Sequence, residues 1–108
     1  MFKEICEQYF RLFSEQNIKE LSELFSEDVI LRDWENDARG KDQVVAVNQH
    51  IFDSVETIEV LPLAFYEEAF TVAAELEIIV NQTEKLLVVD IITFNESEKI
   101  VSVRAYQG

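Results

Sequence analysis

One run of the sequence reads LLVVDIITF, from Leu86 to Phe94, and has the composition of a buried strand. Its apolar side chains occupy both faces of the strand, and a single carboxyl group, that of Asp90, stands at the centre. Asp is among the residues least often fully buried, because an unpaired carboxylate taken out of water either destabilises the protein or takes up a proton. We therefore predict that the pKa of Asp90 is raised and that the neutral acid donates a hydrogen bond at pH 7.

The first half of the chain shows apolar residues at helical spacing. Asn17, with Glu20 three residues later, is typical of a helix N-cap, and Phe25 falls on the buried edge of the helix that follows. The expected elements are a helix from about Phe2 to Glu15, a short helix after Asn17, a strand from Val29 to Trp34, a polar loop from Glu35 to Gly40, and a third helix whose apolar stripe runs from Val44 to Val55.

From Thr57 onward the apolar residues recur at every second position, which is typical of strands. We expect a strand through Ile58 and Pro62, one from Phe70 to Val80, the Asp90 strand, and a last strand ending near Tyr106, paired as successive antiparallel hairpins. Residues 1–108 then form one α+β domain, with three N-terminal helices packed on one face of a curved, mostly antiparallel sheet. Because the long strands are apolar on both faces, we expect a second copy of the chain to cover the other face.

The composition excludes several classes of protein. The formal net charge of −13 comes from 22 acidic and 9 basic residues and opposes binding to nucleic acids or anionic lipids. No apolar run approaches the ~20 residues of a membrane span, and the N-terminus lacks the layout of a signal peptide. With one histidine and one cysteine, no metal site is expected. We therefore expect a cytoplasmic protein without a cofactor and without nucleic-acid or membrane partners.

The order of the elements, with the segments Val88–Phe94 and Lys99–Tyr106, resembles the nuclear transport factor 2-like (NTF2-like) superfamily, and within it the SnoaL-like proteins and ketosteroid isomerase. The segments Tyr9–Asp28 and Val29–Asp33 carry the rest of the resemblance. It implies a cone-shaped α+β fold whose curved sheet wraps a deep pocket for a small apolar molecule. It also implies a homodimer formed through the outer face of the sheet.

The resemblance implies catalytic roles for three residues. The general base of the isomerase is an Asp at the end of the first strand, and Asp33 holds that position here. Its oxyanion donors are a Tyr in the first helix and an Asp in the penultimate strand, which match Tyr9 and Asp90. In that isomerase a neutral Asp and a Tyr both donate to one oxygen. The implied reaction is abstraction of a proton α to a carbonyl, with stabilisation of the dienolate.

Five further residues are expected to contact the substrate. Phe25 and Asn48 stand where the isomerase has tyrosines that support its catalytic Tyr, and the chain is shorter than typical isomerases, so a bulky steroid is not expected. Trp34 follows the predicted base and either lines the mouth of the pocket or caps the dimer. The complete set is Trp34, Phe25, Asn48, Val88 and Val103.

Each catalytic candidate also has a structural interpretation. The carboxyl group of Asp90 is then bonded to Tyr9 or to backbone amides, Asp33 is a turn residue, and Tyr9 is part of the core. Because the superfamily reuses its pocket, the alternative function is a non-catalytic small-ligand-binding or dimerisation module. Convergence of Asp33, Asp90 and Tyr9 on one cavity is the observation that separates the two interpretations.

Overall fold

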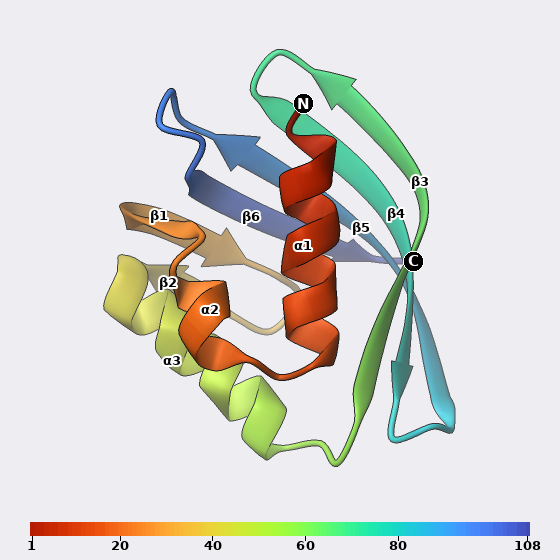
Figure 1. Ribbon diagram of the computed structural model, residues 1–108. Helices are drawn as coiled ribbons and strands as arrows, with labels where there is room; N and C mark the ends of the chain where they lie inside the picture. Colours follow the sequence, from red (N-terminus) through yellow and green to blue (C-terminus); the bar gives the residue numbers. More distant parts are fainter.

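The computed structural model, which describes residues 1–108, contains three helices and one six-stranded sheet (Figure 1). The predicted α+β class and the order of the helices are confirmed. The elements are α1 (Lys3–Ser14), α2 (Ile18–Ser22), β1 (Phe25–Arg32), β2 (Asp37–Arg39), α3 (Lys41–Asp53), β3 (Ile58–Glu68), β4 (Thr71–Val80), β5 (Glu84–Phe94) and β6 (Ile100–Gln107).

The helices form where the apolar stripes predicted them. In α1 the stripe buries Cys6, Tyr9 and Phe10 against the sheet. Asn17 caps α2, since its side-chain oxygen accepts the backbone N–H of Glu20 at 3.2 Å. The structure differs from the prediction at the end of α2, because Phe25 belongs to β1 and not to the helix.

The sheet has the strand order β2-β1-β6-β5-β4-β3. The last four strands pair as successive antiparallel hairpins, as predicted. β1 instead lies parallel to β6, with Leu31 opposite Val103, a pairing between the two ends of the chain. The prediction of a continuous loop from Glu35 to Gly40 was wrong, because residues 37–39 pair with β1 and bury Ala38 opposite Leu31.

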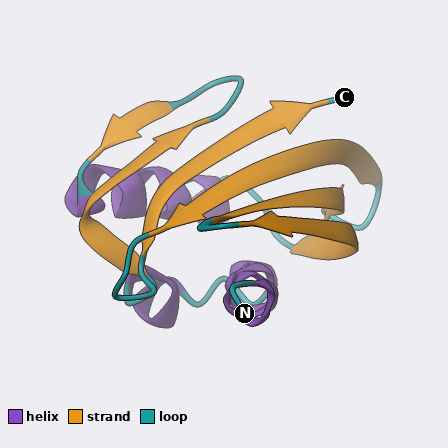
Figure 2. Ribbon diagram, turned by 90° about the horizontal axis from the view of Figure 1, so that it is seen from above, coloured by secondary structure: helices purple, strands orange, loops and turns teal.

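The helices cover one face of the sheet. Figure 2 shows the sheet curving, with α1 on one side of the long strands. α1 packs against β3, whereas α3 packs against β1 and β2, so the concave side is closed by helices at both ends. The opposite face carries exposed apolar side chains, and no helix combines the length and apolar character that a membrane crossing requires.

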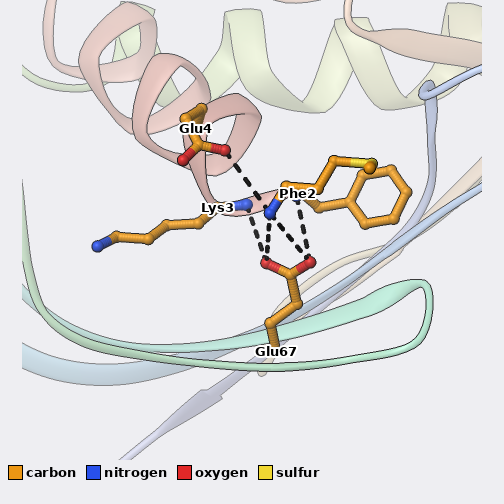
Figure 3. Close-up of polar contacts among 5 residues, drawn as sticks. Phe2, Lys3, Glu4 and Glu67 are labelled. Carbon is orange, nitrogen blue, oxygen red and sulfur yellow. Dashed lines mark hydrogen bonds and ion pairs between the residues drawn. The ribbon is translucent and has the colours of Figure 1, made fainter.

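The N-terminus of α1 is held by one carboxylate from β3. Glu67 accepts the backbone N–H groups of Phe2 and Lys3 at 3.3 and 3.2 Å, and it lies 3.4 Å from the α-amino group of Met1 (Figure 3). These groups are the unpaired donors at the positive end of the helix dipole. The bond from the Phe2 N–H, followed by the attraction of the α-amino group, lowers the pKa of Glu67.

We expect Glu67→Gln to destabilise the protein at pH 7 and to have little effect at pH 3. A lowered pKa in the folded state stabilises the protein above the unfolded value of 4.5, and this contribution is lost as the pH falls through the folded value. Urea unfolding at both pH values measures the effect. Glu68→Gln is the matched control, since Glu68 is an exposed neighbour with no such partners. Equal midpoints for the two variants at pH 7 would exclude a stabilising role for Glu67.

Candidate active site

A cavity of about 230 Å³ lies between the helices and the concave face of the sheet. Of the 22 residues that line it, 16 are hydrophobic. Tyr9 reaches it from α1, Asp33 from the turn after β1, and Asp90 from the centre of β5. The three residues predicted to be catalytic therefore meet at one apolar cavity, although they lie far apart in the sequence.

Asp90 sits at a point where the sheet leaves room for a carboxyl group. Its partners on the adjacent strands are Ala74 of β4 and Ala105 of β6, two small residues directly beside it. Asp90 is 8% exposed, and burial, followed by the negative charge of Asp33, raises its pKa from 3.8 to about 7. Its carboxyl group has no hydrogen-bond partner in the protein, so it is bonded neither to Tyr9 nor to backbone amides.

The ring of Tyr9 is packed among aromatic side chains, while its hydroxyl group is unpaired. The rings of Phe10, Phe13 and Phe25 lie 5.5 to 6.1 Å from it, centroid to centroid. Burial raises the pKa of Tyr9 far above its usual value, and the charges of Asp90 and Asp33 add to the shift. The hydroxyl group is therefore a neutral donor, and buried hydroxyl groups normally have a partner.

Asp33 forms the turn that joins β1 to β2. Its Oδ1 atom accepts the backbone N–H groups of Glu35 and Asn36 at 2.8 and 2.6 Å, and both carboxylate oxygens accept the Asn36 side-chain amide at 3.1 Å. Asp33 is thus a turn residue, as the structural interpretation predicts, and it lines the cavity as well. Oδ2 has only one donor and keeps a free lone pair for a proton.

Four of the five predicted substrate-contacting residues line the cavity, namely Trp34, Asn48, Val88 and Val103. Trp34 is 46% exposed and lies beside Asp33, at the rim. Phe25 is not among the lining residues. Because β1 begins at Phe25, this side chain is buried in the core, where its ring packs edge-on against Tyr9.

Much of the apolar lining was not identified from the sequence. Ile51 from α3, Val60 from β3, and Leu76 and Ile78 from β4 all line the cavity. Their spacing identified them as inward-facing residues, but periodicity does not distinguish a side chain that faces a cavity from one packed in a solid core. The structure has no group of three or more His, Cys, Asp or Glu side chains arranged to hold a metal ion.

The arrangement combines groups suited to proton transfer. Asp33, on the rim, is positioned to accept a proton, whereas Asp90 and Tyr9, in the apolar interior, are positioned to donate hydrogen bonds to an oxygen. Because the pKa of Asp90 is raised, its protonated carboxyl group can act as the acid while a second carboxylate acts as the base. Donors without internal partners are also preorganised, since they break no existing hydrogen bond when a ligand oxygen arrives.

Comparisons with known proteins agree with this architecture. The model of the SnoaL-like domain family matches residues 6–103. Among solved structures, an NTF2-like protein of unknown function from Cytophaga hutchinsonii has a TM-score of 0.84 at 10% identity, covering 100% of this chain and 90% of that one. A comparison with curated proteins found no similar sequence.

Two further similar structures carry provisional functional names. A provisionally named polyketide cyclase from Sinorhizobium meliloti has a TM-score of 0.85 at 14% identity, covering 94% of this chain and 93% of that one. A provisionally named ketosteroid isomerase from Kribbella flavida has a TM-score of 0.83 at 14% identity, covering 99% and 77%. At these identities the likeness shows the fold alone. With its three helices on a curved sheet and a family match over residues 6–103, the chain belongs to the SnoaL-like domain family.

Proposed function

We propose that this protein is an isomerase-like enzyme that abstracts a proton α to the carbonyl group of a small apolar substrate and stabilises the resulting dienolate. One observation carries the proposal. Tyr9 and Asp90 are buried residues whose polar groups have no partner in the protein, and both line the apolar cavity that Asp33 borders. Buried unpaired polar groups destabilise a protein, so their retention favours a role in binding.

In the proposed reaction Asp33 takes the α proton of the substrate. The electron pair of the broken C–H bond forms the new C=C bond, and the π electrons of the carbonyl group move to its oxygen. Tyr9 and the protonated Asp90 donate hydrogen bonds to that oxygen, where the negative charge develops. For a β,γ-unsaturated substrate, Asp33 then returns the proton to the γ carbon. The electron pair on the oxygen re-forms the carbonyl group, and the C=C bond moves into conjugation with it, which completes an isomerisation without any cofactor.

The cavity limits the substrate to a small, mostly apolar molecule. Its volume of about 230 Å³ and its hydrophobic lining suit a mono- or bicyclic carbonyl compound. The names of two structural relatives, a polyketide cyclase and a ketosteroid isomerase, are consistent with a carbonyl substrate.

Phenols and naphthols test the proposal because they imitate an enolate, and a site that stabilises a transition state binds its mimics tightly. We expect 2-naphthol and substituted phenols to bind the wild type, with affinity that rises with ligand acidity. Isothermal titration calorimetry with four or more phenols at pH 6 measures the slope. If no phenol binds, or if affinity follows ligand size alone, the enolate-stabilising role is wrong.

The alternative is a non-catalytic module that binds a small ligand or serves dimerisation. The turn at Asp33 favours this alternative, since three donors converge on one oxygen of its carboxylate and already give it a structural role. In that case Tyr9 and Asp90 bind a carbonyl ligand without turnover. Binding of phenols without any exchange of α protons is the result expected for this module.

We also propose that the protein is a homodimer formed through the outer face of the sheet. Leu63, Leu87, Val89 and Tyr106 are exposed there, between 36% and 59%. All four also border one groove that extends from β3 across β4 and β5 to β6, and Glu75 of β4 lines it as well. Exposed apolar surface of this kind marks an interaction site.

The charges on the outer face suit a two-fold symmetric pairing. Arg32 of β1 and Arg104 of β6 are register neighbours, and neither forms an ion pair within the chain. Glu75 and Glu77 belong to β4, between the apolar residues of β3 and those of β5, with Glu75 opposite Val89. A two-fold axis near β5 brings the arginines of each copy toward the glutamates of the other.

Sedimentation tests the dimer directly. We expect the wild type to sediment as a dimer at micromolar concentration and Leu87→Glu to sediment as a monomer, because the new charge is desolvated at the centre of the interface. Ser97→Glu, which adds the same charge in the exposed turn between β5 and β6, should remain dimeric. A monomeric wild type contradicts the proposal.

A further inference from the structure

Asn48 is the most deeply buried polar side chain of the molecule. It is 1% exposed and lies on the inner stripe of α3 between Val44 and Phe52, each one turn away. Its side-chain nitrogen and oxygen are both closed to solvent and without a hydrogen-bond partner, and no other side-chain nitrogen or oxygen in residues 1–108 combines these two properties. Asn48 also lines the cavity that Tyr9 and Asp90 share.

An unpaired amide at this position works against folding. Each buried donor or acceptor that loses its hydrogen bond to water without replacement destabilises the folded protein. The flanking members of the stripe are apolar, and an apolar side chain of similar size would fill the same space without that cost. Packing and stability therefore give no reason for an asparagine, whereas recognition of a ligand does.

We propose that Asn48 is a specificity-determining residue that binds a second polar group of the ligand, a neutral group with a donor and an acceptor side by side, such as a carboxamide or a lactam. This inference rests on the proposed function for the first polar group of the ligand, its carbonyl oxygen. Tyr9 comes from α1, Asp90 from β5 and Asn48 from α3, so three different elements bring polar groups to the one cavity. The substrate class is thus a carbonyl compound with a second, amide-like group.

The unpaired atoms of Asn48 define the chemistry of that group. Its Nδ2 needs an acceptor and its Oδ1 needs a donor, and a carboxamide or lactam supplies both. A carboxylate supplies only acceptors, which would repel Oδ1, and the charge of Asp33 at the same cavity disfavours a second anion. The amide atoms are closed to solvent in this structure, so the ligand must displace neighbouring side chains to reach them.

The first test measures stability. We expect Asn48→Leu, whose side chain has the same branching and the same number of heavy atoms as asparagine, to unfold at a higher urea concentration than the wild type. Leu is also the better helix former, so Asn48→Val is the second variant, because Val and Asn have similar helix propensities. If both variants unfold at lower urea concentrations than the wild type, the amide is satisfied in solution and the proposal is overturned.

The second test measures specificity with two ligands and two proteins. Calorimetry compares 2-naphthol with 6-hydroxy-2-naphthamide, which adds a carboxamide at the far end, in the wild type and in Asn48→Leu. We expect the carboxamide to raise the affinity of the wild type by about tenfold more than that of the variant, the size of one net hydrogen bond. The double comparison cancels the effect of the carboxamide on the acidity of the naphthol.

The two proposals fail in different ways. If 2-naphthol binds through Tyr9 and Asp90 but the carboxamide gains nothing from Asn48, the inference about Asn48 is wrong and the proposed function stands. If the carboxamide binds through Asn48 but the affinity is unchanged in Tyr9→Phe and Asp90→Leu, the ligand site is real and the enolate chemistry is wrong. If neither ligand binds the wild type, both proposals are overturned.

Discussion

Asp33→Asn should abolish the exchange of α protons while leaving the affinity for 2-naphthol level or higher. An amide cannot accept the proton, and a general base typically contributes ~10²–10⁴-fold to the rate. The amide oxygen of the variant can still accept the N–H groups of Glu35 and Asn36, so the turn is retained. Removal of a negative charge beside the cavity also removes a source of repulsion for an oxyanion mimic.

The exchange reaction is followed by NMR or mass spectrometry with 2-tetralone in deuterated buffer, since 2-naphthol is the aromatic analogue of its enol. Asp37→Asn is the matched control, because Asp37 is an exposed residue a few positions later that does not line the cavity. Exchange by Asp33→Asn at the wild-type rate would show that Asp33 is not the base. A wild type that binds 2-naphthol but exchanges no protons would favour the non-catalytic module.

Tyr9→Phe and Asp90→Leu should each lower the rate of exchange by ~10²–10³-fold, the effect typical of removing one oxyanion donor. Each should also weaken the binding of 2-naphthol by more than the ~1 kcal/mol of an ordinary hydrogen bond. The loss is large because both donors are buried and preorganised. The same calorimetric and exchange measurements apply, and Phe13→Leu, a change in the apolar lining, controls for altered packing. An affinity for 2-naphthol that is the same in both variants as in the wild type would contradict the proposed function.

The pH dependence of the affinity for 2-naphthol tests the role of Asp90 separately from that of Tyr9. A carboxyl group donates a hydrogen bond only while protonated, and Asp90 has a pKa of about 7, so the affinity of the wild type for 2-naphthol should fall between pH 6 and pH 8. Asp90→Leu should lose this dependence, whereas Tyr9→Phe should keep it. Affinity that does not change over this range, or a dependence that survives in Asp90→Leu, would contradict a protonated Asp90 as the donor.

The raised pKa of Asp90 also affects stability. The folded state holds this proton more tightly than the unfolded state, whose value is 3.8, so the contribution of Asp90 to stability is present below that value and is lost as the pH rises to about 7. Urea unfolding at pH 5 and at pH 8 measures this effect. The loss of stability from pH 5 to pH 8 should be smaller in Asp90→Asn than in the wild type.

Periodicity was sufficient to predict most of the elements. The apolar stripe of α1 and the alternating apolar residues of β4 and β5 each identified an element whose inner face is buried. These patterns arise because one face of each element packs in the core and is removed from water. The predictions failed where pairing between distant segments overrode the local signal. Residues 37–39 are polar except for Ala38, and they form a strand only because β1 supplies backbone partners.

The sequence by itself determined most of the element types and the inward position of Asp90, since these depend on local spacing and residue type, and its resemblance to SnoaL-like proteins indicated the family. Only the tertiary structure decided that Tyr9, Asp33 and Asp90 share one cavity, because the parallel pairing of β1 with β6 joins the two ends of the chain. It alone also showed that Ala74 and Ala105 leave room beside Asp90 and that the Asn48 amide has no partner. Residue types set what each group can donate or accept, whereas the absence of a partner depends on every element packed around it.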